Sequence, residues 1–254
     1  KFEAWAAYDY SANDFSGSFM SDGDGNLNML AVGGDIKLSP HLIAGMMAGL
    51  SQNKGDYGSA SFKLNQTTGT VYVGWGDGPW YAGATLGGSN LDYSNVDRDI
   101  TLGTGTRTET GSTQGYTTTG RVLGGYWFKV DEWLHGPTAK WTYQDIKVRA
   151  YQEQGANSTT MSFGQQDRKS SILSLGWQAS GVVANVRPYA KVTWEYELQD
   201  DLRYVQASVY GMGGAFSLPA YQPDSNWFNF NLGAAADFGK VTGYISGTAT
   251  TGKS

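Results

Sequence analysis

Two histidines, His41 and His135, are the candidates for acid–base chemistry in this sequence. A hydrolytic site needs a histidine held beside a serine or an aspartate in a defined constellation. His41 follows Pro40 in a predicted turn, and His135 precedes Gly136 at the start of a predicted strand. Because neither histidine is placed to act as the base of such a site, we predict no catalytic residues.

Metal and phosphate sites are not indicated either. The run from Asp22 to Asn26 has the alternating acids that begin a calcium loop, but such a loop needs a glutamate at its twelfth position, where this sequence has Gly33. The glycine pairs at 33–34, 87–88 and 124–125 lie inside predicted strands, without the following helix of a phosphate loop. The chain has no cysteine, which excludes disulfides and thiolate sites. We predict no metal and no cofactor.

Alternation of apolar and polar side chains is the strongest pattern in the chain. Such alternation places successive side chains on opposite faces of a β-strand. Between Trp227 and Phe238, apolar residues occupy one face and polar residues the other. Between Val186 and Glu195, one face carries Arg187, Lys191 and Glu195, three charges that a closed protein core could not bury. The pattern favours a sheet with water on one side and lipid on the other.

The two faces define two sets of predicted site residues. Those expected to line a lumen are Arg121, Lys140, Arg187, Tyr189, Lys191, Glu195 and Asn231. Those expected to face lipid are Val71, Val73, Trp141, Val192, Trp194, Phe228, Phe230 and Leu232. The inward charges could grip a polar segment lodged in the pore or pair with one another across neighbouring strands, and these two roles are compatible.

Short turns alternate with long polar loops along the chain. The turns centre near Ser39, Asp77, Asp131, Asn185 and Gly239. The loops are predicted at residues 12–26, 54–61, 94–114, 152–168 and 199–225. This rhythm is typical of an up-and-down barrel in a bacterial outer membrane, which has short periplasmic turns and long extracellular loops.

The predicted fold is therefore all-β: a transmembrane antiparallel up-and-down β-barrel. We assign residues 1–254 to one domain of the 12-stranded type in which about eleven strands are present. Bacterial single-chain barrels have an even number of strands, because a closed sheet leaves no unpaired edge in lipid. We therefore expect a twelfth strand after Ser254. The chain begins at Lys1 without a signal peptide, so we take it as a mature or excised segment.

Composition agrees with a barrel but leaves one soluble alternative. The net charge of −5 and the isoelectric point of about 5.0 argue against nucleic acid as a partner. Aromatic residues make up 14% of the chain and suit the two membrane–water boundaries. A soluble, aromatic-rich β-sandwich with a carbohydrate site could share this composition, but it would bury the apolar faces instead.

Three stretches, residues 142–151, 158–166 and 190–197, carry a resemblance to a known family. Together with the strand pattern, they resemble the C-terminal translocator β-domain of autotransporters, the type V secretion family of Gram-negative bacteria. Within that family the chain is most similar to the barrels of GDSL-esterase autotransporters. The family pattern also has a helical linker before the barrel and a final strand ending in an aromatic residue, and we expect this segment, Lys1 to Ser254, to lack both.

The resemblance implies an outer-membrane location and a lumen threaded by an α-helix that joins the barrel to an N-terminal passenger. It also implies the barrel-assembly machinery and periplasmic chaperones as partners. Any esterase activity would belong to a passenger absent from this sequence, which contains no Gly-Asp-Ser-Leu string.

Our leading hypothesis is an outer-membrane translocator and anchor, not an enzyme, that assists export and surface display of the passenger. The alternative is a porin-like solute channel of the outer membrane, which would share the same strands and loops. A third class, an outer-membrane enzyme, is disfavoured by the two histidines.

Overall fold

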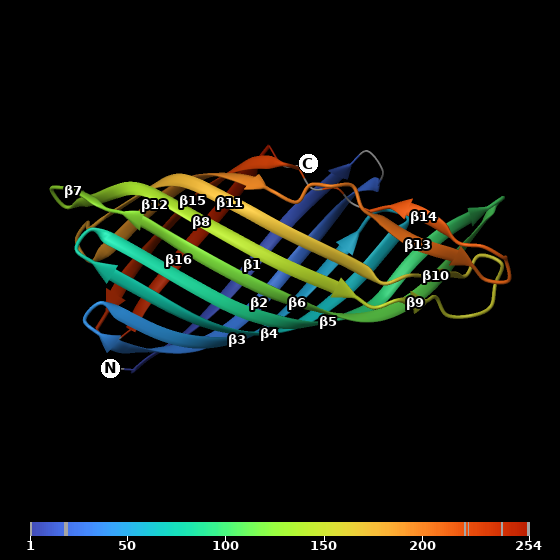
Figure 1. The fold of residues 1–254 in the computed structure, drawn as a ribbon, viewed down its shortest axis with the longest axis horizontal. Coiled ribbons are helices and arrows are strands. Elements are labelled where there is room, and N and C mark those ends of the chain that lie inside the picture. The colour runs from blue at the N-terminus through green and yellow to red at the C-terminus, as the bar shows by residue number, and fades with distance from the viewer. Residues whose placement is uncertain (1, 18–19, 221, 223, 240, 253–254) are drawn as a thin grey trace.

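The computed structural model describes residues 2–17, 20–220, 222, 224–239 and 241–252. Eleven strands follow one another in a single antiparallel sheet (Figure 1). They are β1 (Phe2–Gly17), β2 (Met20–Ser39), β3 (Leu42–Asp56), β4 (Ala60–Asp77), β5 (Trp80–Leu102), β6 (Gly105–Tyr126), β8 (Trp133–Val148), β11 (Gln166–Gly181), β12 (Val186–Glu197), β15 (Asn226–Phe238) and β16 (Val241–Thr251). The short strand β7 (Phe128–Val130) follows β6 and pairs with β8. The predicted strand number is confirmed.

Short turns join the strands at one end of the sheet. They lie where the sequence predicts them, at residues 40–41, 78–79, 131–132 and 184–185 and at Gly239. Gly78, Asp131 and Ala184 adopt positive φ angles of 55°, 54° and 57°. Glycine and aspartate accept this left-handed conformation more readily than most residues, which makes the turns at Gly78 and Asp131 readable from sequence; at the turn of residues 184–185 the residue with positive φ is an alanine, and the neighbouring Asn185 carries the turn signal.

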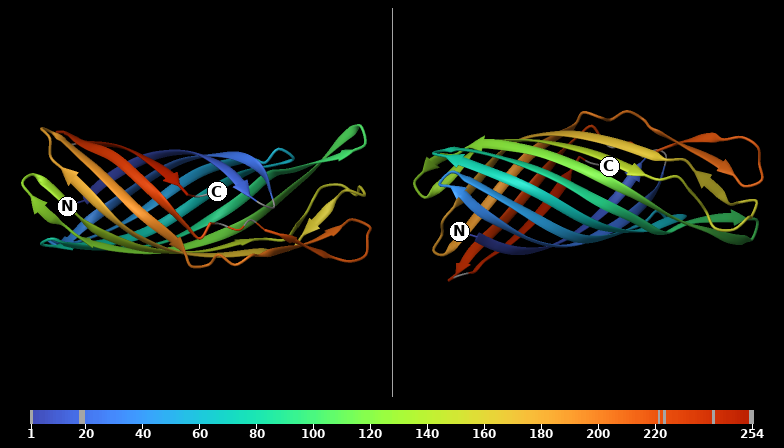
Figure 2. Two further views of the ribbon diagram at one scale, coloured as in Figure 1. Left: turned by 90° about the horizontal axis from the view of Figure 1, so that it is seen from above. Right: turned by 60° about the horizontal axis from the view of Figure 1, so that its bottom comes forward.

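The register of the sheet separates an apolar face from a polar face. On β12 and β15, Val192 pairs with Phe230, and these side chains are 38% and 47% exposed. The next residues of β12 on the opposite face, Thr193 and Glu195, are only 5% and 3% exposed. The sheet curls around its polar face (Figures 1 and 2). Apolar side chains therefore cover the outside, and polar ones line the interior.

The two end strands of the sheet, β1 and β16, are not paired with each other. Each neighbouring pair along the path is antiparallel, so the first and the eleventh strand run in the same direction. Two strands that run in the same direction cannot close an antiparallel sheet directly. No helix among the described residues is long and apolar enough to cross a membrane.

The predicted loops at 12–26, 54–61 and 94–114 are largely wrong, because strands occupy most of their described residues. Residues 18–19 of the first loop lie outside the described residues. The β5–β6 hairpin remains paired as far as Leu102 and Gly105, and Gly103, with φ of 64°, lies in its tight turn. The many threonines in this hairpin favour extended backbone, and Thr side chains pair well across strands. The polarity of these threonines predicts a loop, but their preference for extended backbone prevails, and the segment forms paired strands.

The two remaining predicted loops, 152–168 and 199–225, contain a second sheet. Its order is β14–β13–β10–β9, with strands β9 (Tyr151–Gln152), β10 (Met161–Phe163), β13 (Tyr204–Val209) and β14 (Phe216–Pro219). It lies at the end of the barrel opposite the short turns (Figure 1). These strands are two to six residues long and pair across two loops, so no local pattern in the sequence marks them.

Buried carboxylates fasten this second sheet to the β5–β6 hairpin. Arg98 donates to both carboxylate oxygens of Glu153 at 2.9 and 2.7 Å, and to the backbone oxygen of Thr159 at 2.8 Å. The Glu109 carboxylate accepts hydrogen bonds from the Thr159 and Thr160 hydroxyls. Both glutamates are almost fully buried. We call these five residues the loop clasp.

Inside the barrel, aromatic rings pack over glycines of neighbouring strands. The Trp5 indole Nε1 donates to the Tyr72 hydroxyl at 3.0 Å, and that hydroxyl donates to Asp35 Oδ2 at 3.0 Å. The Tyr72 ring occupies the space above Gly45, and the Trp5 ring the space above Gly33. The glycines are needed here because any side chain would collide with these rings.

We expect the loop clasp to open in acid. Hydrogen bonds from Thr159, Thr160 and Asn157 hold the pKa of Glu109 below its ordinary value of 4.5. A carboxyl whose pKa is lowered by folding stabilises the folded loops above pH 4.5, and this contribution is lost as pH falls through the lowered value. Hydrogen–deuterium exchange of residues 149–165, corrected for intrinsic rates, should therefore be faster at pH 3 than at pH 7. In Glu109→Gln the pH 7 rate should rise; equal protection of the wild type at both pH values would contradict this role.

Replacement of Gly45 by valine should destabilise the barrel. A Cβ atom at this position would meet the Tyr72 ring and lie 2.7 Å from the Gly34 carbonyl oxygen. Such overpacking typically costs about 1–3 kcal/mol. The free energy of unfolding is measured by denaturant titration in detergent micelles, with heat-modifiable gel migration as the readout of the folded fraction. The matched control is Gly69→Val on β4, where nothing lies within 4 Å of the added Cβ; equal stability of both variants would contradict the packing role of Gly45.

Candidate functional site: the lumen wall

An ion pair on the inner face of β8 and β12 forms the centre of the lumen wall. Lys140 Nζ lies 3.7 Å from Glu195 Oε1. The Glu195 carboxylate also accepts hydrogen bonds from the Thr193 hydroxyl, at 2.8 Å, and from the Ser174 hydroxyl of β11. Glu195 is almost fully buried, and these partners satisfy its charge. Three strands are therefore tied together through one carboxylate.

Two further cations, Arg121 and Lys191, flank this ion pair. Both are close enough for their charges to act on the Lys140 ammonium. Lys191 lies in register between Gln178 of β11 and Asn231 of β15. Neither Arg121 nor Lys191 has an ion-pair partner within the part of the chain that the structure describes. This wall therefore carries more positive than negative charge.

The other predicted lumen residues lie on the same face but outside this cluster. Arg187 donates to Asp237 Oδ1 at 3.0 Å, and both side chains are about half exposed near the short turns. The Tyr189 ring covers Gly233, in the same way that Tyr72 covers Gly45. Asn231 donates to the Thr248 hydroxyl at 2.6 Å. Their role against a segment in the lumen stays a prediction.

Acidic residues lie on the opposite wall. Glu3 of β1 pairs in register with Asp35 of β2, on the face that carries Trp5, and Asp9 lies farther along β1 on that face. β8 and β11 are the seventh and eighth of the eleven strands, so the curl of the sheet brings them across the interior from β1 and β2 (Figure 2). Among the described residues this face of β1 and β2 carries the acids Glu3, Asp9 and Asp35 and one cation, Lys37, so a mainly negative wall faces the mainly positive one across the lumen.

Sequence reasoning missed several members of the site. Ser174, Thr193 and Glu197 are buried on the inner face, where the Glu197 carboxylate accepts hydrogen bonds from the Ser170 hydroxyl and the Ser171 amide. The alternation at Thr193, Glu195 and Glu197 could have identified two of them. The acids of β1 and β2 give no such indication, because Glu3 and Asp35 come from different strands and meet only through the β1–β2 register.

The residues expected to face lipid lie on the outer face of the sheet. Val71, Val73, Trp141, Val192, Phe228, Phe230 and Leu232 are exposed, with fractions from 38% to 65%, and Trp194 is half-buried. Trp141 donates from Nε1 to the Ser171 hydroxyl at 2.9 Å, which satisfies its polar atom. Their contact with lipid acyl chains stays a prediction.

The two histidines lie at the end of the sheet that carries the short turns. His41 Nδ1 lies 3.0 Å from the Gly76 carbonyl oxygen. The His135 ring forms a cluster with Phe128 and Trp177, at centroid distances of 5.7 and 5.8 Å, and those two rings also stack on each other at 6.3 Å. Among the described residues, no group of three or more His, Asp or Glu side chains is arranged to hold a metal ion.

Curated relatives include esterases and a lipase. The chain is 28% identical over 232 residues to Esterase EstA of Pseudomonas aeruginosa, covering 89% of this chain and 35% of that protein. It is 24% identical over 212 residues to Lipase 1 of Photorhabdus luminescens, covering 82% of this chain and 33% of that protein. The chain thus spans about a third of the length of these relatives.

Solved structures show the same fold. The translocator domain of autotransporter NalP from Neisseria meningitidis superposes with a TM-score of 0.76 at 16% identity, covering 98% of this chain and 83% of that one. The β-domain of the Bordetella autotransporter Brka gives a TM-score of 0.64 at 18% identity, with 98% and 93% covered. The family model of the autotransporter β-domain matches residues 4–248. This chain belongs to the autotransporter β-domain family, and it is a translocator barrel of the Gram-negative outer membrane.

Proposed function

We propose that the lumen of this translocator holds the polar segment that joins the barrel to an N-terminal passenger. The observation that carries the proposal is the lumen wall, where Arg121 and Lys191 lack ion-pair partners among the described residues. Cations that face a water-filled lumen can bind a segment bearing carboxylates, while Glu3 and Asp35 across the lumen attract its lysines and arginines. Such a segment would be held in one rotational orientation.

The passenger itself is the second part of the proposal. EstA and Lipase 1 are about three times as long as the region they share with this chain, and their names describe hydrolases. We infer that the barrel exports and displays a passenger of this class, and that any esterase activity belongs to it. Delivery by periplasmic chaperones and insertion by the barrel-assembly machinery follow from membership of the family.

A further strand between β1 and β16 would complete the barrel. Both edges expose backbone donors and acceptors, which lipid cannot satisfy. Since β1 and β16 run in the same direction, one additional antiparallel strand pairs with both of them. This parity argument supports a twelve-stranded barrel.

The test reverses the two flanking cations in the full-length protein. In Arg121→Glu/Lys191→Glu, loss of two contacts of about 1 kcal/mol each should loosen the lumen segment. The open-channel fraction in planar bilayers should rise about tenfold or more, and surface display of the passenger should fall. Lys169→Glu is the matched control, because this lysine lies on the outer face. Heat-modifiable migration verifies that each variant is folded.

Unchanged conductance and display in the double variant would overturn the proposed role of the lumen wall. A wild-type protein that conducts continuously, with no blocked state, would instead support a porin-like channel. The facing charges also suit that alternative, because opposed charged walls order ions in a pore.

A further inference from the structure

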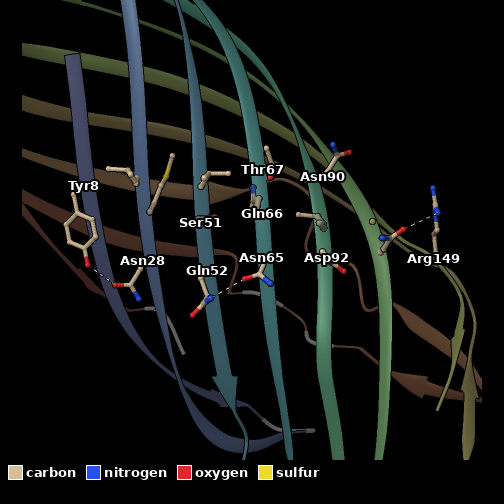
Figure 3. Close-up of a pocket in the computed structure, with 16 residues that line it drawn as sticks. Tyr8, Asn28, Ser51, Gln52, Asn65, Gln66, Thr67, Asn90, Asp92 and Arg149 are labelled. Atoms are coloured by element: carbon tan, nitrogen blue, oxygen red, sulfur yellow. Dashed lines mark hydrogen bonds between the residues drawn. The ribbon is translucent and has the colours of Figure 1, made fainter. Parts of the chain in front are cut away.

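The outer face of the barrel carries a continuous polar row just beyond its apolar surface. Asn28, Gln52, Asn65, Asp92 and Gln114 are successive register partners on β2, β3, β4, β5 and β6. We call these five residues the carboxamide row, since four of them are amides. Each lies on the same strand face as the exposed apolar residues of its strand, so the row points outward, away from the lumen (Figure 3).

The row marks an abrupt change of polarity. One step toward the short turns, the outward residues of β2 and β3 are Leu30 and Leu50, which pair with each other and are 55% and 62% exposed. The leucines and the carboxamide row line one shallow depression of about 750 Å³. One side of this depression is therefore apolar and the other is rich in hydrogen-bonding groups.

The amides of the row keep much of their hydrogen-bonding capacity. Asn28 Oδ1 accepts from the Tyr8 hydroxyl at 2.7 Å, and Gln52 Nε2 donates to Asn65 Oδ1 at 3.2 Å (Figure 3). Asn28 Nδ2, Gln52 Oε1 and Asn65 Nδ2 have no partner among the side chains that the structure describes. An amide presents both donors and acceptors, as do the hydroxyl groups of a sugar.

A cationic side chain lies at one end of the row. Arg149 follows β8, and its Nη1 approaches Gln114 Oε1 at 3.5 Å. Its guanidinium can pair with a phosphate or a carboxylate. On β8, next to this end of the row, the outward residues include Lys147 as well as the aromatic pair Trp141–Tyr143. The depression itself is lined by residues of β1 to β6 and by Arg149.

We infer that this depression binds the junction of sugar headgroup and acyl chain of a phosphorylated glycolipid in the outer leaflet. The family places the barrel in the outer membrane, so the apolar surface that contains Leu30 and Leu50 is continuous with the lipid interface. The leucines contact the first part of the acyl chains, the amides bind sugar hydroxyls, and Arg149 binds an anionic group. This site is on the outer face and is independent of what occupies the lumen.

The test compares lipid retention by full-length protein purified from outer membranes. Gln52→Met/Asn65→Leu keeps the side-chain size but removes the hydrogen-bonding groups. Lipopolysaccharide retained through detergent washing, measured by mass spectrometry, should fall about tenfold, because two hydrogen bonds are lost. The matched control is Gln206→Met on β13, an exposed amide of the loop sheet outside the carboxamide row. Heat-modifiable migration confirms that the variants are folded.

Three ligands, intact lipopolysaccharide, deacylated oligosaccharide and phospholipid vesicles, show whether the depression binds the sugar, the acyl chains or both together. Intact lipopolysaccharide should restore thermal stability to delipidated wild-type protein and have little effect on the double variant. Equal retention by wild type and double variant would overturn the inference, as would an equal loss in Gln206→Met. Equal stabilisation by deacylated oligosaccharide, or by phospholipid vesicles without sugar, would also overturn it, because the proposed site requires both halves of the glycolipid.

Discussion

This structure depends on one constraint: every backbone amide and carbonyl group inside the membrane must be hydrogen-bonded by the protein itself. In the hydrocarbon of a membrane no water is available to bond a free amide or carbonyl, so each strand must pair on both sides. A sheet that meets this requirement by curling on itself acquires an inside and an outside. The side-chain period of two then assigns alternate residues to lipid and to water, and the pair Val192 and Phe230 illustrates the outer set.

The polar interior is a consequence of that alternation, and it creates the possibility of function. An interior of charged groups has to be solvated, paired or occupied. Around Glu195 it is paired, since Lys140, Thr193 and Ser174 satisfy the carboxylate. Beside this cluster, Arg121 and Lys191 have no ion-pair partner among the described residues. The lumen wall therefore combines charges that hold strands together with charges that the proposed function assigns to a bound segment.

Much of the barrel could be predicted from sequence because its rules are local. Turn residues such as Asp131 and the alternation around Val192 each depend on a few neighbouring positions. The clasp could not be predicted, because Glu109 and Glu153 meet Thr159, Thr160 and Arg98 only after two loops have come together. The same holds for Glu3 and Asp35, because only the curvature of the folded sheet places these acids across the lumen from Lys140. Long-range placement accounts for these misses, whereas the β5–β6 hairpin was missed because its threonines are polar yet favour strands.

The second sheet makes the end of the barrel opposite the short turns an ordered rim rather than a set of irregular loops. Loops predicted to be irregular are paired strands held by buried carboxylates, with Tyr151 packed over Gly111 of β6. Ordered loops have already lost much of their conformational entropy, so contact with another domain costs less than it would for a flexible loop. The ordered rim lies at one end of the barrel and the charge pattern lies within the barrel. Under the proposed function the two act in sequence: the lumen orients the segment as it leaves the barrel, and the rim is the first surface that the segment meets.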